Sequence, residues 1–154
     1  MKVLILTTAI PSKYGTGADI ASRHFIEAIK TLGHSVSVVG YQRWGDPSTI
    51  EKDMIVVGQR HIETKSARWH PIVWSINGFI RRLPYTSAKY YSARYLSTVK
   101  KLLAEQHYDA IVLEHSSQLC WLKPAIDQGH KLAVLAHNIE HAIFKERIPE
   151  TKKH

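Results

Sequence analysis

Gly15-Thr16-Gly17 is the first group of residues whose types and spacing suit chemistry. It lies between an apolar run at residues 3–6 and a stretch of helical periodicity that ends near residue 33. Glycines before a helix let backbone amides approach a phosphate or a carboxylate closely, and they equally suit a tight turn with positive φ. The spacing excludes a dinucleotide fingerprint, because Ile20 stands where a third glycine or alanine belongs, and no Gly-Lys-Ser/Thr of a P-loop follows.

The sequence His137-Asn138-Ile139-Glu140-His141 is the second such group, and it follows an apolar run at residues 131–136. Its letters match H-x-x-E-H, with which inverted zinc peptidases place two imidazoles and a general base on one helical face. Zinc would need both histidines inside a helix and a third ligand from a later helix, so we expect no metal here. His137 is then either a capping or core histidine or a ligand-facing group, with Asn138 and Glu140 as polar partners.

Glu114 and His115 follow a third apolar run, at residues 109–113. They either line a crevice or belong to a solvated loop. The chain holds a single cysteine, which excludes an internal disulfide and favours a reducing cytoplasm.

Short apolar runs and helical patterns alternate along the chain and must position these residues. Strands are predicted at residues 3–6, 36–39, 54–57, 109–113 and 131–136, and helices at 16–32, from 86 or 87 onward and from 116 or 117 onward. In the first helix the apolar face is predicted to consist of Ala18, Ala21, Phe25, Ala28, Ile29 and Leu32. This alternation predicts a single α/β domain, a three-layer α/β/α Rossmann-like fold with a mostly parallel sheet. Ligands of such sheets bind beyond the carboxyl ends of the strands, where the glycine loop and His137 would both lie.

The net charge of +8 is concentrated in one region. Residues 60–101 hold nine basic residues and one acidic residue, so this window alone carries a charge of the same size. Within it, the large aromatic residues Trp69, Trp74 and Phe79 accompany the basic residues Arg81 and Arg82. Two interpretations fit this segment: a basic aromatic surface at a membrane interface, or helix core with a solvated face. No apolar run approaches the ~20 residues of a membrane-spanning helix.

Together these residues resemble the N-terminal domain of a GT-B fold glycosyltransferase of family 4, the retaining group 1 type. The likeness is carried by Lys2-Val3-Leu4-Ile5-Leu6, Pro11, Gly15-Thr16-Gly17, Leu32-Gly33-His34-Ser35-Val36-Ser37-Val38 and His137-Asn138-Ile139-Glu140-His141. The resemblance implies a hexosyltransferase that moves a sugar from a nucleotide diphosphate sugar, its substrate, to a glycan or lipid-linked acceptor, without a further cofactor. It also implies a cytoplasmic protein, peripheral on the inner face of the membrane.

The family's site residues map onto this chain as follows. Gly15 and Gly17 would lie beside the donor diphosphate, although the family usually has adjacent glycines and this chain has Thr16 between them. His137 would be the catalytic-site histidine, bonding a hydroxyl of the transferred sugar. Asn138, Glu140, Glu114 and His115 would line the sugar or acceptor cleft, and the stretch from residue 69 to 82 would form the membrane or acceptor patch.

The resemblance covers residues 1–154 as one acceptor-side domain and leaves out the family's donor-binding domain. We therefore expect a truncated or split enzyme that is inactive alone and whose partner is the missing C-terminal half. The main alternative is a non-enzymatic α/β binding or partner module, whose basic surface recruits an anionic polymer, although we expect no nucleic acid as partner. A zinc hydrolase working through H-x-x-E-H ranks third.

Overall fold

The computed structural model describes residues 1–46, 50–61, 70–126 and 129–136. Its elements are β1 (Lys2–Ala9), α1 (Gly17–Thr31), β2 (Ser35–Arg43), β3 (Met54–Arg60), α2 (His70–Arg81), α3 (Tyr85–Tyr90), α4 (Ala93–Glu105), β4 (Ala110–Glu114), α5 (Ser116–Leu119), the 3₁₀ helix η2 (Cys120–Leu122), α6 (Lys123–Ile126) and β5 (Leu132–Leu135). The strands form a five-stranded sheet in the order β3-β2-β1-β4-β5, and each neighbouring pair is parallel. The predicted α/β class is confirmed.

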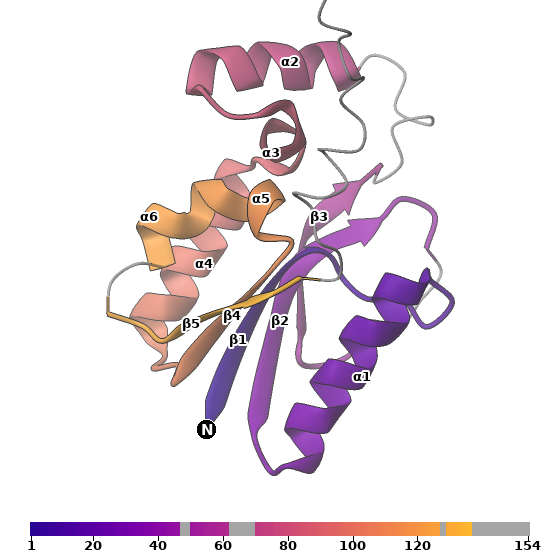
Figure 1. Ribbon diagram of the computed structural model, residues 1–154, viewed down its shortest axis with the longest axis vertical. Coiled ribbons are helices and arrows are strands. Elements are labelled where there is room, and N and C mark those ends of the chain that lie inside the picture. Colours follow the sequence, from indigo (N-terminus) through magenta and orange to yellow (C-terminus); the bar gives the residue numbers. More distant parts are fainter. Residues whose placement is uncertain (47–49, 62–69, 127–128, 137–154) are drawn as a thin grey trace, which may run out of the picture.

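Helices cover both faces of the sheet, with α1 on one side and α4, α5 and α6 on the other (Figure 1). The alternation of β1 explains this arrangement, because successive side chains of a strand point to opposite faces. Val3 and Ile5 belong to the apolar core beneath α1. Leu4 and Leu6 belong to the second core, which includes Tyr95 of α4. The protein is therefore a three-layer α/β/α structure of the Rossmann-like kind.

The first helix begins and ends where the sequence predicts, but it buries a different face. Thr16 is the N-cap, and Gly33 after the helix has a φ of 80°. The predicted apolar face of this helix is wrong in part, since Ala21, Ala28 and Leu32 are exposed. The buried residues of α1 are Asp19, Ser22 and Ile26. Polar side chains can face inward here because the start of α1 lies over polar groups at the end of the sheet, described below.

The helix predicted from residue 86 or 87 onward is two helices rather than one. The backbone leaves the helical conformation at Tyr91 and Ser92, and Ser92 then caps α4 by accepting a hydrogen bond from the Tyr95 amide at 3.3 Å. Arg60 at the end of β3 donates to the carbonyls of Lys89 and Tyr91. The break thus frees backbone acceptors that tie the α3–α4 junction to the sheet.

All strands run in one direction, so their carboxyl ends meet at one edge of the sheet, here called the carboxyl edge. From β1 the chain crosses one face through α1 to reach β2, whereas from β4 it crosses the other face through α5 and α6 to reach β5. The space between the ends of β1 and β4 is therefore a topological switch point, where open α/β sheets bind ligands. Helices α2 and α3 lie beyond the carboxyl edge, at the top of Figure 1.

Candidate functional site

The glycine loop at the switch point is closed by a carboxylate of the chain itself. Asp19, which is only 5% exposed, accepts hydrogen bonds from the Thr16 amide at 2.7 Å and from the Thr16 hydroxyl at 2.9 Å. A Cβ at Gly15 would collide with the same carboxylate, whereas one at Gly17 would meet nothing within 4 Å. Gly15 is therefore needed for the close approach of Asp19, and the loop's Thr16 amide is already engaged.

Arg43, at the end of β2, completes this arrangement. Its Nη2 lies 3.0 Å from each carboxylate oxygen of Asp19, so the start of α1 is tied to the neighbouring strand. Among the residues that the structure describes, the Arg43 Nε is a buried donor without a hydrogen-bond acceptor. The loop thus combines one carboxylate with a guanidinium that retains further donor capacity.

Glu114 lies on the opposite side of the switch point, at the end of β4. It is 2% exposed, and one of its oxygens accepts a hydrogen bond from Ser22 of α1. The carboxylate therefore contacts α1 inside the fold instead of facing solvent. The interpretation of Glu114 as part of a solvated loop is therefore wrong.

His115 follows Glu114 and has a left-handed backbone, with φ 54° and ψ 58°, at the N-cap of α5. Non-glycine residues adopt this conformation at a cost, and they concentrate at functional sites. The half-buried ring stands at the carboxyl end of the strand that borders the switch point. His115 thus shares with Arg82, whose φ is 53°, the backbone conformation that is enriched at functional sites.

Four of the predicted site residues lie outside the described residues: His137, Asn138, Glu140 and Trp69. The H-x-x-E-H segment falls there too. Within the described residues, no group of three or more histidines, cysteines, aspartates or glutamates is placed to hold a metal ion. In the same part of the chain, no helix has the length and apolar character to cross a membrane.

The remaining patch residues of α2 face different ways. Trp74 is 5% exposed and packs inward, with its ring 5.3 Å below the Lys89 ammonium, whereas Phe79 is 88% exposed. Arg81 lies 4.0 Å above the ring of Tyr91, and Arg82 is exposed in the turn after the helix. The outward face of α2 is completed by aliphatic residues that the sequence analysis did not single out, Ile72, Val73, Ile76 and Ile80.

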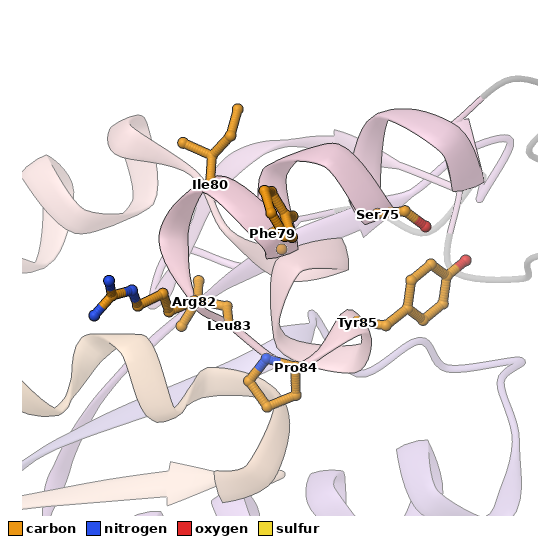
Figure 2. A pocket seen from close by; sticks show the side chains of 8 residues that line it. Ser75, Phe79, Ile80, Arg82, Leu83, Pro84 and Tyr85 are labelled. Carbon is orange, nitrogen blue, oxygen red and sulfur yellow. The ribbon is translucent and has the colours of Figure 1, made fainter.

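A hollow of about 880 Å³ opens beside Phe79, here called the Phe79 hollow. Figure 2 shows its walls: Ser75, Phe79 and Ile80 come from α2, while Arg82, Leu83, Pro84 and Tyr85 come from the turn into α3. The hollow is wide and mostly apolar, with the Arg82 guanidinium at its margin in Figure 2. Such a surface suits an apolar partner with a negatively charged border.

Two further hollows lie along the carboxyl edge, and Trp44 lines both. The Gly15 hollow, of about 240 Å³, is lined by the loops after β1 and β2, including Tyr14, Gly15 and Arg43. The Trp44 hollow, of about 520 Å³, lies between the ends of β2 and β3 and helix α2. Its volume falls within the range of small-molecule sites. Trp44 therefore stands where two adjoining concave surfaces meet.

Aromatic rings form a continuous row in the wall of the Trp44 hollow. Trp44 stacks on His61 with centroids 5.2 Å apart and an interplanar angle of 25°. The row continues through His70 to Trp74, with centroid separations of 5.7 and 5.8 Å. Behind Trp74, burial lowers the pKa of the Lys89 ammonium. Arg60 also lines the hollow, which is therefore an aromatic cavity with a cation in its wall.

Arg43, Trp44 and Arg60 are not among the site residues predicted from the sequence, although the sequence contains a signal for them. The predicted site residues follow the first, fourth and fifth predicted strands, whereas ligands of such sheets bind beyond the carboxyl ends of any of the strands. Arg43 and Arg60 close β2 and β3, and Trp44 follows β2 directly. The same rule applied to all five strands would have included them.

Comparison with known proteins adds little to this geometry. No family model and no curated protein sequence matches the chain. Among solved structures, it is similar to the C-terminal domain of a hydrogenase from Pyrococcus furiosus, with 12% sequence identity, coverage of 88% of this chain and 90% of that chain, and a TM-score of 0.47. A likeness of that degree says nothing about activity, so function has to be argued from the carboxyl edge itself.

Proposed function

We propose that this chain is the N-terminal, acceptor-binding half of a glycosyltransferase that moves a sugar from a nucleotide diphosphate sugar to a glycan or lipid-linked acceptor. One observation carries the proposal: the exposed apolar face of α2 lies beside the carboxyl edge that holds the switch point. A lipid-linked acceptor has an apolar chain that stays in the membrane and a polar head that must reach the binding edge. One end of this molecule offers a surface suited to each part.

The composition of α2 supports contact with an anionic membrane surface. Ile72, Ile76, Phe79 and Ile80 recur at helical spacing and are exposed, while Arg81 and Arg82 close the helix. The chain has no acidic residue between positions 70 and 104. Amphipathic helices of this kind lie in the membrane interface, and each basic residue near anionic lipid contributes about 1 kcal/mol.

The donor would approach from the other side of the carboxyl edge. Because Asp19 occupies the Thr16 amide and pairs with Arg43, a diphosphate beside the glycine loop would depend on the remaining Nε donor of Arg43 and on groups of the donor-binding half. His115 would face the sugar from β4. For His137, the bond to a sugar hydroxyl is a proposal that rests on the resemblance alone.

Vesicle sedimentation tests the membrane part of the proposal. We expect the protein to bind vesicles of phosphatidylcholine with phosphatidylglycerol, to bind pure phosphatidylcholine weakly, and to lose binding as salt rises. Phe79→Ser should weaken binding at least tenfold, since burying a phenylalanine side chain contributes about 2 kcal/mol. Leu32→Ser is the matched control, because Leu32 is 72% exposed at the far end of α1. Absence of binding at low salt, or equal loss in both variants, would refute membrane contact.

Amide chemical shifts test the transferase part. Titration with a panel of nucleotide diphosphate sugars should shift the signals of Gly15, Thr16, Gly17 and His115 more than those of the remaining chain. Shifts confined to other regions would contradict a donor site at the switch point. Tight, salt-dependent binding of nucleic acid without any response to sugars would instead favour the non-enzymatic module, because counterion release governs that kind of binding.

A further inference from the structure

We infer that the Trp44 hollow binds a sugar ring that carries a negatively charged group, with the ring stacked on Trp44. The inference rests on the proposed function in one respect only, namely that this sugar is the acceptor of the transfer. Binding itself depends on three features of the hollow: an available aromatic face, polar amides along the wall, and positive charge with no carboxylate among the described lining residues.

The aromatic face is the indole of Trp44. It is 63% exposed, and His61 is stacked on it at 5.2 Å. Covering a large exposed ring on a turn is favourable, because its apolar surface is removed from water. A ring that a stacked neighbour already holds in place also loses little conformational entropy on binding. The C–H face of a pyranose is apolar and flat enough to cover such an indole.

The wall of the hollow beyond Trp44 is also aromatic. The ring of His61, directly after β3, contacts the ring of His70 at the start of α2, and His70 contacts Trp74 of the same helix. The amide side chains of Gln59 and Asn77 also line the hollow. Ring faces together with a few amides suit a polyhydroxylated ring, whose edges need hydrogen bonds and whose faces do not.

The charge of the hollow favours an anion. Arg60 is the cation among the described lining residues, and the described lining contains no aspartate or glutamate. Its guanidinium is held above the Tyr41 ring at 4.5 Å and donates to backbone carbonyls, which are neutral acceptors, and no ion pair joins it to a carboxylate of the described residues. A positive concave surface raises the local concentration of negatively charged ligands.

Indole signals provide the test. The chain has four tryptophans, and Trp121 is a built-in control because its Nε1 donates to the Gln118 carbonyl inside the fold. We expect D-glucuronate and D-glucose 6-phosphate to shift the Trp44 and Trp74 signals, and D-glucose to bind at least tenfold more weakly. The two anionic probes distinguish a carboxylate from a phosphate as the charged group. The Trp121 signal should stay unchanged.

Two substitutions locate the site. Trp44→Ala should weaken binding of the better anionic sugar at least tenfold, and Trp44→Phe should retain most of it. Leu32→Ala is the control, since Leu32 is a large exposed apolar residue at the far end of α1 and does not line this hollow. Circular dichroism of each variant separates loss of the ring from loss of the fold.

Three results would overturn the inference: no response of Trp44 and Trp74 to either anionic sugar, equal binding by Trp44→Ala, or shifts produced equally by inorganic phosphate or by uridine monophosphate. The transferase proposal fails separately, when nucleotide sugars leave the Gly15 and His115 signals unchanged. Binding of an anionic sugar at Trp44 combined with that failure would support an anionic-sugar site on a protein of another function.

Discussion

At the scale of single residues, Gly15 decides whether the loop at the switch point can form. The Asp19 carboxylate lies against Gly15, so Gly15→Ala forces either the loop or the start of α1 to move. We expect this variant to lower the free energy of unfolding by about 1–3 kcal/mol, the usual cost of overpacking. Urea denaturation followed by circular dichroism measures it.

Gly17→Ala is the control for this prediction. It changes the same residue type two positions away, in the first turn of α1, where a Cβ meets nothing within 4 Å. Alanine suits a helix better than glycine, so we expect this variant to gain up to about 1 kcal/mol. If both alanine variants kept the stability of the parent protein, the close approach of Asp19 to Gly15 would not exist in solution.

At the scale of elements, α1 is fixed to the segment before β3 by charge. The Arg23 Nη2 lies 2.7 Å from the Glu51 Oε1, with both side chains partly exposed. The hydrogen bond from Arg23 lowers the pKa of Glu51 below its ordinary value of 4.5, so the pair stabilises the fold above that pH and loses its effect as the pH falls through the lowered pKa. Arg23→Gln should therefore cost up to about 1 kcal/mol at pH 7.

Denaturation curves of the parent and of Arg23→Gln, compared between pH 7 and acid, check the sign. The difference between the two proteins should shrink as the pH drops below 4.5, because the protonated Glu51 no longer attracts Arg23. Lys101→Gln removes a more exposed pair with Glu105, whose atoms are 3.8 Å apart, and should change little at any pH. A difference for Arg23→Gln that grew toward acid would contradict the assignment.

The sequence predicted the elements well where one periodic pattern was sufficient. Every predicted strand coincides with a strand of the sheet, because β1, β2 and β4 are nearly continuous apolar runs, as strands covered on both faces are. The caps of α1 could be predicted for a similar local reason, since Thr16 offers a capping hydroxyl and Gly33, which has no Cβ, adopts the positive φ after the helix without strain.

The sequence failed where the reason for a position lies far along the chain. Asp19 and Ser22 face inward only because Arg43 and Glu114 come close to them in the fold, and a helical pattern contains no trace of those partners. Likewise, the break between α3 and α4 is held by Arg60, whose place is fixed by the sheet. The candidate site could therefore be predicted as an edge of the sheet, but not as a set of contacts.

At the scale of the whole molecule, backbone strain and the proposed binding surfaces lie at the same end. Arg82 and His115 are the non-glycine residues with positive φ in the described part of the chain, at 53° and 54°. His115 borders the switch point, and Arg82 follows the exposed face of α2 beyond the same edge. Strain of this kind persists where the surrounding structure enforces it, and it is concentrated at functional sites.

Substitutions of Arg82 separate stability from binding. Arg82→Gly relieves the left-handed backbone and should raise the free energy of unfolding by about 0.5–1 kcal/mol, the cost of the left-handed conformation less that of a flexible glycine. It should also weaken binding to anionic vesicles about fivefold, because one charge near the membrane contributes about 1 kcal/mol. Arg82→Gln should weaken binding equally without the gain in stability, so thermal denaturation and sedimentation together identify the reason for each change. If Arg82→Gly instead bound vesicles as well as the parent protein, the strained arginine would have no role at the membrane, and the apolar face of α2 would have to act without it.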